Sequence, residues 1–140
     1  MPDPFIVVPI RHLGHGFAIG EALTYRFDTG YIDACNTIGI SYIFLHALHQ
    51  GFIQPHFKRA LIGVFDTLVF DGIASAIVPS FMTYHVCRIT ANVMSDIRGI
   101  PLVVRKWGPT CIGLGVLFLT YAYIDETVDK IMNETIRTSY

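Results

Sequence analysis

Two pairs of histidines have the spacing of metal ligands on a helix. His12 and His15 are three residues apart, as are His46 and His49, so each pair presents two imidazoles on one helical face. Haem or copper held between helices is one interpretation. Metal sites usually have three or four ligands and a second shell of hydrogen bonds, however. We therefore favour polar contacts inside a helix bundle, and we predict no metal site and no cofactor.

Three ionisable residues lie inside apolar segments. Asp66 and Asp71 interrupt one such segment, and Arg88 lies near the middle of the next. A charge in such a place is costly unless it faces protein, water or an opposite charge, which makes these residues functional candidates. A proton or solute path is one interpretation, but acids five residues apart point to different helical faces. We predict instead that Asp66 or Asp71 pairs with Arg88.

The sequence carries no recognisable catalytic motif. Gly16 and Gly20 follow no strand and belong to no phosphate-loop pattern, and no serine or cysteine lies in a nucleophile motif. Cys35, Cys87 and Cys111 are too widely spaced for a disulfide framework or a zinc site. The ten lysines and arginines form no run longer than two, which argues against nucleic-acid binding. We predict that the protein is not an enzyme and binds no nucleic acid.

The composition indicates the fold class. The 140 residues are 52% hydrophobic and only 15% charged, with a mean hydropathy of +0.49. Soluble domains usually carry about 25% charged residues, so we expect the outer surface of this chain to meet lipid. The length allows one compact unit, residues 1–140. We predict an all-α, multi-span membrane protein with amphipathic helices at both ends, Ile10–Phe27 and Ile124–Tyr140.

Three segments are predicted to cross the membrane. They cover about residues 32–50, 60–79 and 108–124, and the last of them begins at Gly108 and Pro109. Pro79 interrupts the pattern, and residues 81–97 form a further helix. That helix is either a fourth crossing or lies along the surface. We favour a helix folded back against residues 60–79.

Basic and aromatic residues mark the predicted membrane edges. Arg105, Lys106 and Trp107 stand directly before the last span, and Lys58 and Arg59 stand before the second. Cations and tryptophan prefer the headgroup layer of a membrane. We predict that these residues contact phospholipids, and whether cardiolipin is among them stays open.

Small residues four apart allow two helices to approach each other closely. The pairs in the predicted spans are Cys35 with Gly39, Gly63 with Thr67, and Gly72 with Ala76. We predict that these positions pack against neighbouring helices.

Four segments of the chain, in this order, resemble the mitochondrial fission process protein family, also called the eighteen-kilodalton mitochondrial protein family. Together they extend over most of the chain, and the third is the most specific. They are RHLGHGFAIGEA (residues 11–22), DTLVFDGIASAIVPSFMTYHVC (66–87), PLVVRKWGPTCIGLG (101–115) and IDETVD (124–129).

The resemblance implies a multi-span protein of the mitochondrial inner membrane with no assigned catalytic residues. It also implies a link to mitochondrial division and to inner-membrane integrity and bioenergetics. The linker from Gly51 to Arg59 is shorter than in other members, which puts partner docking on it in question. The start of the chain resembles neither a secretory signal nor a transit peptide, so any targeting information is expected to be internal.

Three functions are open at this point. The first prediction is a non-catalytic accessory subunit of a large inner-membrane assembly, such as a respiratory-chain or ATP synthase complex, with other membrane subunits and phospholipids as partners. The alternative is a mitochondrial fission or inner-membrane organising factor outside any stable complex. The third is a small transporter or proton-conducting protein that uses Asp66, Asp71 and Arg88.

Overall fold

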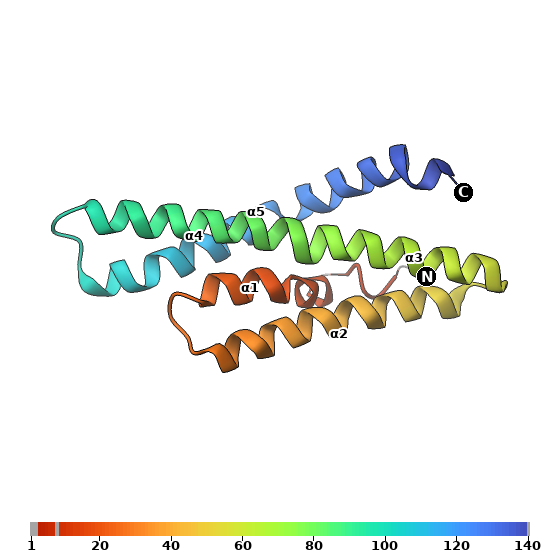
Figure 1. The fold of residues 1–140 in the computed structure, drawn as a ribbon, viewed down its shortest axis with the longest axis horizontal. Helices are drawn as coiled ribbons and strands as arrows, with labels where there is room; N and C mark the ends of the chain where they lie inside the picture. Colours follow the sequence, from red (N-terminus) through yellow and green to blue (C-terminus); the bar gives the residue numbers. More distant parts are fainter. Residues whose placement is uncertain (1–2, 8, 140) are drawn as a thin grey trace.

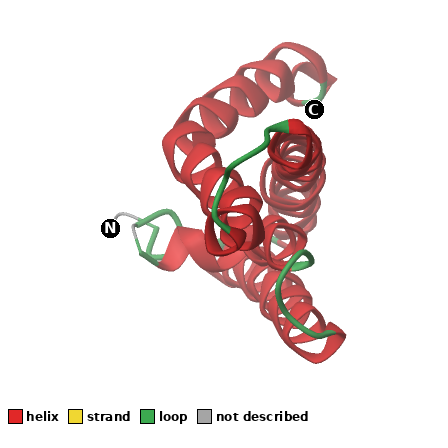
Figure 2. Ribbon diagram, turned by 90° about the vertical axis from the view of Figure 1, so that its left-hand side faces the viewer, coloured by secondary structure: helices red, strands yellow, loops and turns green. Residues whose placement is uncertain are grey.

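The computed structural model describes residues 3–7 and 9–139, and every regular element among them is a helix (Figures 1 and 2). This confirms the all-α prediction. In chain order the elements are the 3-10 helix η1 (Ile10–His15), α1 (Gly16–Leu23), α2 (Thr29–Ile53), α3 (Phe57–Asp71), the π-helix η2 (Gly72–Ile77), α4 (Val78–Asp96), α5 (Leu102–Thr135) and the 3-10 helix η3 (Arg137–Ser139).

One continuous helix of 40 residues, Phe57–Asp96, is formed by α3, η2 and α4. The predicted break at Pro79, with residues 81–97 folded back on residues 60–79, is therefore wrong. Proline donates no backbone hydrogen bond, and its ring crowds the preceding turn of a helix. The wide π turns of η2 end two residues before Pro79, and the helix continues through the proline without a break.

The other helices lie along this long helix (Figure 1). α2 packs antiparallel to α3, and α5 packs antiparallel to α4. α1 contacts α2, α4 and α5 and lies among them. Figure 2 looks onto the turn between α4 and α5, where Gly99 has a φ of 95°, in the left-handed region that favours glycine. The packing of these helices brings the start of the chain next to the middle of the long helix and to α5.

The last long helix begins earlier than predicted. α5 starts at Leu102, directly after Pro101, and Pro109 lies inside it rather than at its start. Arg105, Lys106 and Trp107 therefore belong to the first turns of α5 and do not precede it. The sequence alone suggested a later start because an internal proline costs a helix about 3 kcal/mol or more. Here Pro109 is buried, and its carbonyl accepts a hydrogen bond from Cys87 Sγ at 3.2 Å.

Two helices among the described residues, not three or four, are long and apolar enough to cross a membrane. They are Phe57–Asp96 and Leu102–Thr135, whose most apolar windows have mean hydropathies of 1.9 and 1.4. The predicted spans at residues 60–79 and 108–124 and the predicted helix at 81–97 fall within them. The predicted span at residues 32–50 falls within α2, whose polar side chains, such as His46, His49 and Gln50, lower its hydropathy.

Many large apolar side chains face outward, and several polar and charged side chains are buried. Within the predicted amphipathic helix Ile10–Phe27, Arg11 is 3% exposed whereas Leu13 is 50% exposed. A helix in the membrane interface would present that polar face to water, so the structure gives this segment an internal role instead. The same pattern holds elsewhere, since Phe52 and Leu119 are 85% and 84% exposed. An apolar exterior around a polar interior is typical of helical proteins in lipid.

The predicted amphipathic tail is the continuation of α5. Ile124, Val128 and Met132 are buried and pack with Ala74 of η2 in the hydrophobic core. α5 ends at Thr135, and the last residue of the predicted tail, Tyr140, lies outside the described residues.

Candidate functional site

The guanidinium of Arg11 lies at the centre of a buried charged cluster. Its Nε and Nη2 donate to the two carboxylate oxygens of Asp125 at 2.8 and 2.6 Å. Its Nη1 donates to Asp71 Oδ1 at 3.1 Å, to Ser75 Oγ at 2.6 Å and to the Tyr42 hydroxyl at 3.3 Å. One side chain from η1 thus joins α2, the middle of the long helix and α5.

Glycine allows η1 to lie close enough for this contact. A Cβ on Gly14 would lie 2.7 Å from the Tyr42 ring and 3.1 Å from Ser75 Oγ. A Cβ on Gly16 would lie 2.2 Å from the carbonyl oxygen of Cys35 and 2.8 Å from the backbone nitrogen of Gly39. Any side chain at these two positions would push η1 and α1 away from α2, because real Cβ contacts are not that short.

The π-helix and the residue before it position two groups that accept hydrogen bonds from Arg11, the carboxylate of Asp71 and the hydroxyl of Ser75. Asp71 is the last residue of α3, Ser75 lies within η2, and both are 0% exposed. A π segment widens the helix locally, and such segments are frequent at functional sites. Asp71 and Ser75 are four residues apart, and both side chains face η1 at this point.

His46 connects the cluster to the start of the chain. Its Nδ1 lies 2.5 Å from Asp71 Oδ2, and its Nε2 lies 3.0 Å from Asp3 Oδ2. Gln50 Nε2 also donates to Asp3. The Phe5 ring stacks on His46 with centroids 5.2 Å apart, and the carbonyl of Phe5 accepts a hydrogen bond from Tyr42 at 2.7 Å. The N-terminal segment is thus held across α2 by polar contacts.

The cluster changes the pKa values of those of its members that lie outside the two candidate spans. Burial would lower the pKa of Arg11, but the hydrogen bonds and charge of Asp125, with the charge of Asp71, raise it, so Arg11 stays a cation. Burial and the neighbouring positive charge of Arg11 lower the pKa of His15 to about 4. Burial likewise opposes protonation of His46, but Asp71 and Asp3 outweigh it and raise the pKa of His46.

The raised pKa of His46 predicts a pH-dependent stability. A group whose pKa is higher in the folded state stabilises fully below its unfolded pKa, here 6.5, and loses this as pH rises through the folded pKa. We expect the wild-type melting temperature to fall relative to that of His46→Gln as pH rises from about 6 to about 9. Thermal unfolding of both proteins in the same detergent measures this difference. A gap that is constant with pH, or that widens in favour of the wild type, contradicts the assignment.

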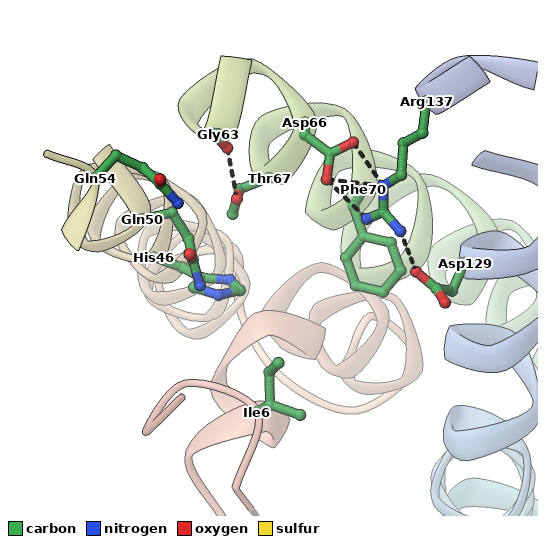
Figure 3. A pocket seen from close by; sticks show the side chains of 10 residues that line it. All are labelled: Ile6, His46, Gln50, Gln54, Gly63, Asp66, Thr67, Phe70, Asp129 and Arg137. Atoms are coloured by element: carbon green, nitrogen blue, oxygen red, sulfur yellow. Dashed lines mark hydrogen bonds and ion pairs between the residues drawn. The ribbon is translucent and has the colours of Figure 1, made fainter. Parts of the chain in front are cut away.

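A second cluster surrounds Arg137, just after α5. Arg137 Nε and Nη2 donate to Asp66 at 2.7 to 3.1 Å, and Nη1 donates to Asp129 Oδ1 at 2.7 Å and to Asn133 Oδ1 at 2.6 Å. These contacts bridge the end of α5 to α3, as Figure 3 shows for Asp66 and Asp129. The hydrogen bonds that Arg137 donates to Asp66 and Asp129 outweigh burial and raise the pKa of Arg137.

The predicted pairing of Asp66 or Asp71 with Arg88 is wrong. Asp71 binds Arg11 and His46, Asp66 binds Arg137, and Arg88 donates to the Tyr84 hydroxyl at 3.3 Å from the exposed side of α4. The reason is the continuous helix. Arg88 follows Asp71 by 17 residues, which is about 25 Å along a helix axis. Arg88 therefore lies far from Asp71 along the helix and binds Tyr84 instead.

The predicted small-residue positions have different surroundings. Cys35 and Gly39 face α1, and a Cβ on Gly39 would lie 3.0 Å from the Phe17 ring. A Cβ on Gly63 would make ordinary contact with Gln50 at 3.6 Å. Gly72 has open space around it, so the structure shows no close helix approach there, and Ala76 of η2 is half-buried.

The predicted membrane-edge residues lie on the surface. Lys58, Arg59, Arg105 and Lys106 are exposed, and Arg105 donates to the carbonyl of Ile97 at 3.3 Å. Trp107 is 37% exposed. Its ring packs edge-on against Phe27 with centroids 6.0 Å apart, and the guanidinium of Arg26 lies 4.8 Å from its centroid. Their contact with phospholipids stays a prediction.

One histidine of each pair has clear protein contacts. His46 binds two acids, and the ring of His12 packs against Tyr121 and Phe118 at 4.7 and 5.1 Å between centroids. Among the described residues, no three of the types His, Cys, Asp and Glu are grouped so that they could hold a metal ion.

The central role of Arg11 and Asp125 was not predicted. Each lies within one of the two helices that were predicted to be amphipathic, Ile10–Phe27 and Ile124–Tyr140, and neither was singled out as a candidate. The composition already indicated an exterior that meets lipid, and in such a chain the polar face of a helix is the internal one. Applying that rule to η1 and to the end of the last span would have indicated both residues.

The fold and the site together define a small all-helical protein with two candidate membrane-spanning helices and charges paired in its interior. The family model described as Mitochondrial 18 KDa protein (MTP18) matches residues 55–132. The chain belongs to this family.

Relatives named mitochondrial fission process protein 1 match nearly the whole chain. The protein of Danio rerio is 30% identical over 139 residues, which cover 94% of this chain and 84% of its own. The protein of Caenorhabditis elegans is 25% identical, over 99% of this chain and 89% of its own, and that of Homo sapiens is 27% identical, over 94% and 84%. No solved structure matches the chain.

These comparisons correct the first functional prediction. We expected an accessory subunit of a respiratory-chain or ATP synthase complex, but the relatives are named for mitochondrial fission. In the structure, both predicted amphipathic ends have partners within the chain: Arg11 binds Asp125, and Ile124, Val128 and Met132 pack with Ala74 of η2.

Proposed function

We propose that this protein acts in mitochondrial fission as a non-catalytic, membrane-embedded protein of the mitochondrial inner membrane. The observation that carries the proposal is family membership, with relatives named for the fission process over at least 94% of the chain. The apolar exterior and the two long apolar helices support the membrane part. The windows of these helices are only 17% and 22% buried within the chain, whereas the core helix of a soluble protein is mostly buried.

The arrangement supports a role in organising membrane rather than in catalysis. A continuous helix of 40 residues is about 60 Å long, roughly twice the hydrocarbon thickness, so part of it extends beyond the core of a bilayer or tilts strongly within it. The ion pairs of Arg11 and Arg137 fix the neighbouring helices to this long element. A rigid body of this shape would act on the surrounding membrane through its form and its surface.

Depletion of the protein is expected to lengthen mitochondria, because a missing fission factor leaves division incomplete. Re-expression of the wild-type chain restores the normal length distribution, measured by imaging. Alkaline extraction of the same mitochondria should leave the chain in the membrane pellet. Unchanged mitochondrial length on depletion contradicts the fission role, and release into the alkaline supernatant contradicts membrane embedding.

A further inference from the structure

The N-terminal segment, residues 3–7, is fastened to α2 by polar contacts around His46. Both ring nitrogens of His46 face a carboxylate, since Nδ1 lies 2.5 Å from Asp71 Oδ2 and Nε2 lies 3.0 Å from Asp3 Oδ2. Asp71 ends α3, whereas Asp3 belongs to the N-terminal segment. The first residues of a domain are usually ordered only where such contacts hold them. His46 therefore joins the start of the chain to the buried Arg11 cluster.

This arrangement requires a protonated imidazole. An ionised carboxylate only accepts hydrogen bonds, and a neutral imidazole donates from just one of its two nitrogens. Asp71 is the anionic partner of Arg11 at 3.1 Å. Burial would raise the pKa of Asp3, but the hydrogen bond from the Phe5 backbone and the contact with His46 lower it, so Asp3 stays ionised. The bridge between the two acids is complete only while His46 carries its second proton.

No other group near His46 can replace that proton. Arg11 of η1 lies on the far side of Asp71. His49 of α2 has its Nδ1 3.8 Å from Asp3 Oδ1, beyond hydrogen-bond distance. The remaining titratable groups around the ring are Tyr42 on the same helix, Asp125 on the other side of Arg11, and Asp66, Asp129 and Arg137, which are paired with one another. With His46 neutral, Asp3 has no cation within hydrogen-bond distance among the described residues.

Loss of the proton releases the Asp3 side of this bridge. Asp71 is 0% exposed and keeps Arg11, and its contact with His46 is the shorter of the two, so the remaining proton stays on Nδ1. The lone pair of Nε2 then faces the carboxylate of Asp3, which lies on a terminal segment with its side chain 14% exposed and can turn to water. We propose that residues 3–7 form a latch that is closed while His46 is protonated and opens when His46 loses that proton.

The direction of the pH response follows from the same contacts. Burial opposes protonation of His46, but Asp71 and Asp3 outweigh it and raise the pKa of His46 above its usual 6.5. The latch is therefore fully closed below pH 6.5 and opens as the pH rises through the raised value. In the inner-membrane location of the proposed function, on which this last step rests, the latch responds to the pH of the compartment at this end of the molecule.

The latch lies between two hollows. Ile6 lines a polar hollow of about 350 Å³ together with His46, as Figure 3 shows. Phe5 lines an apolar hollow of about 220 Å³ together with Tyr42. The ring of Phe5 stacks on His46 with centroids 5.2 Å apart, and the carbonyl of Phe5 accepts a hydrogen bond from Tyr42. Opening of the latch uncovers the imidazole and joins the two hollows along α2.

Proteolysis at the bond between Phe5 and Ile6 measures the opening, because cleavage follows the population of the open form when closing is fast. The purified full chain in detergent is digested briefly with a chymotrypsin-type protease between about pH 6 and about pH 9, and mass spectrometry follows the loss of residues 1–5. His46→Gln is digested in parallel at each pH. It has the same cleavage site, so the ratio of the two rates cancels the pH dependence of the protease.

We expect the wild type to be cleaved about tenfold more slowly than His46→Gln at about pH 6, since each unit by which the closed latch raises the pKa of His46 is worth a factor of about ten. The two rates should converge by about pH 9, where His46 is neutral. A ratio that does not change with pH overturns the latch.

Two variants assign the contacts. Asp3→Asn should abolish the pH dependence, because an amide can accept from a protonated imidazole and donate to a neutral one. His49→Gln is the matched control, since it removes the neighbouring histidine that does not bind Asp3, and it should keep the pH dependence. If Asp3→Asn keeps the pH dependence, or His49→Gln loses it, the assignment to His46 and Asp3 is wrong.

Cleavage after Phe17 separates local opening from unfolding. Phe17 belongs to α1, and its ring packs against Gly39 of α2. Opening of the latch should leave cleavage after Phe17 slow at every pH. If the bonds after Phe5 and Phe17 become accessible in parallel, a larger part of the fold opens and the latch is overturned. Failure of this test leaves the fission role standing, because the measurement uses the purified protein and involves no fission.

Discussion

Replacing Arg11 by leucine is expected to destabilise the fold by about 3–5 kcal/mol, because it leaves two acids without their common partner. Asp71 is 0% exposed and accepts a hydrogen bond from Arg11 Nη1 at 3.1 Å. Asp125 accepts two hydrogen bonds from the same guanidinium. Asp71 would keep only its contact with His46, and Asp125 would lose both hydrogen bonds from the guanidinium. Removing the cation from buried carboxylates costs more than the ion pair itself contributes. Denaturant unfolding in detergent, followed by circular dichroism, measures the loss.

Two controls test the physical cause of this loss. Arg88→Leu makes the same substitution on the exposed side of α4, where the guanidinium donates only one hydrogen bond within the described contacts, and it should have little effect. Arg11→Leu combined with Asp71→Asn and Asp125→Asn also removes the two carboxylate charges. This triple variant should be more stable than Arg11→Leu alone. If Arg11→Leu is as mild as Arg88→Leu, the cluster does not stabilise the fold.

The fold class follows from composition and apolar periodicity, but the connections between helices do not. The sequence pattern found the apolar content of α3, α4 and α5, since large apolar residues recur through each of them. It misread Pro79 and Pro109 as boundaries, because the cost of a proline in a helix depends on what surrounds it. Near Pro79 the wide π turns of η2 precede the proline, and Pro109 is buried within α5.

The site was harder to predict than the helices because its members come from distant parts of the chain. Arg11 and Asp125 are 114 residues apart, and Arg11 and Asp71 are 60 apart. Local spacing can suggest that an acid needs a cation, and it did so for Asp66 and Asp71. It cannot choose among the arginines, since that choice depends on which helices pack together. The segments of family resemblance included Arg11, Ser75 and Asp125 without indicating that they meet.

A methyl group on Gly16 is expected to be nearly as damaging as the loss of Arg11. In Gly16→Ala the new Cβ would lie 2.2 Å from the carbonyl oxygen of Cys35 and 2.8 Å from the backbone nitrogen of Gly39. Both are backbone atoms of α2 and cannot rotate away, so α1 must move off α2. Overpacking of this kind costs about 1–3 kcal/mol, and more where backbone must shift. We expect the upper end or beyond, measured by the same unfolding experiment.

Gly115→Ala is the matched control, because Gly115 is an exposed helix residue with open space around it. Alanine is favoured over glycine inside a helix by up to about 1 kcal/mol, so this variant should be as stable as the wild type or more so. Opposite signs for the two Gly→Ala changes would separate close packing from helix propensity.

The displacement of α1 in Gly16→Ala also predicts a link to the Arg11 cluster, because η1 directly precedes α1 and would move with it. Gly16→Ala combined with Arg11→Leu should then cost less than the sum of the two changes, whereas full additivity would show that the glycine contact and the charged cluster are independent.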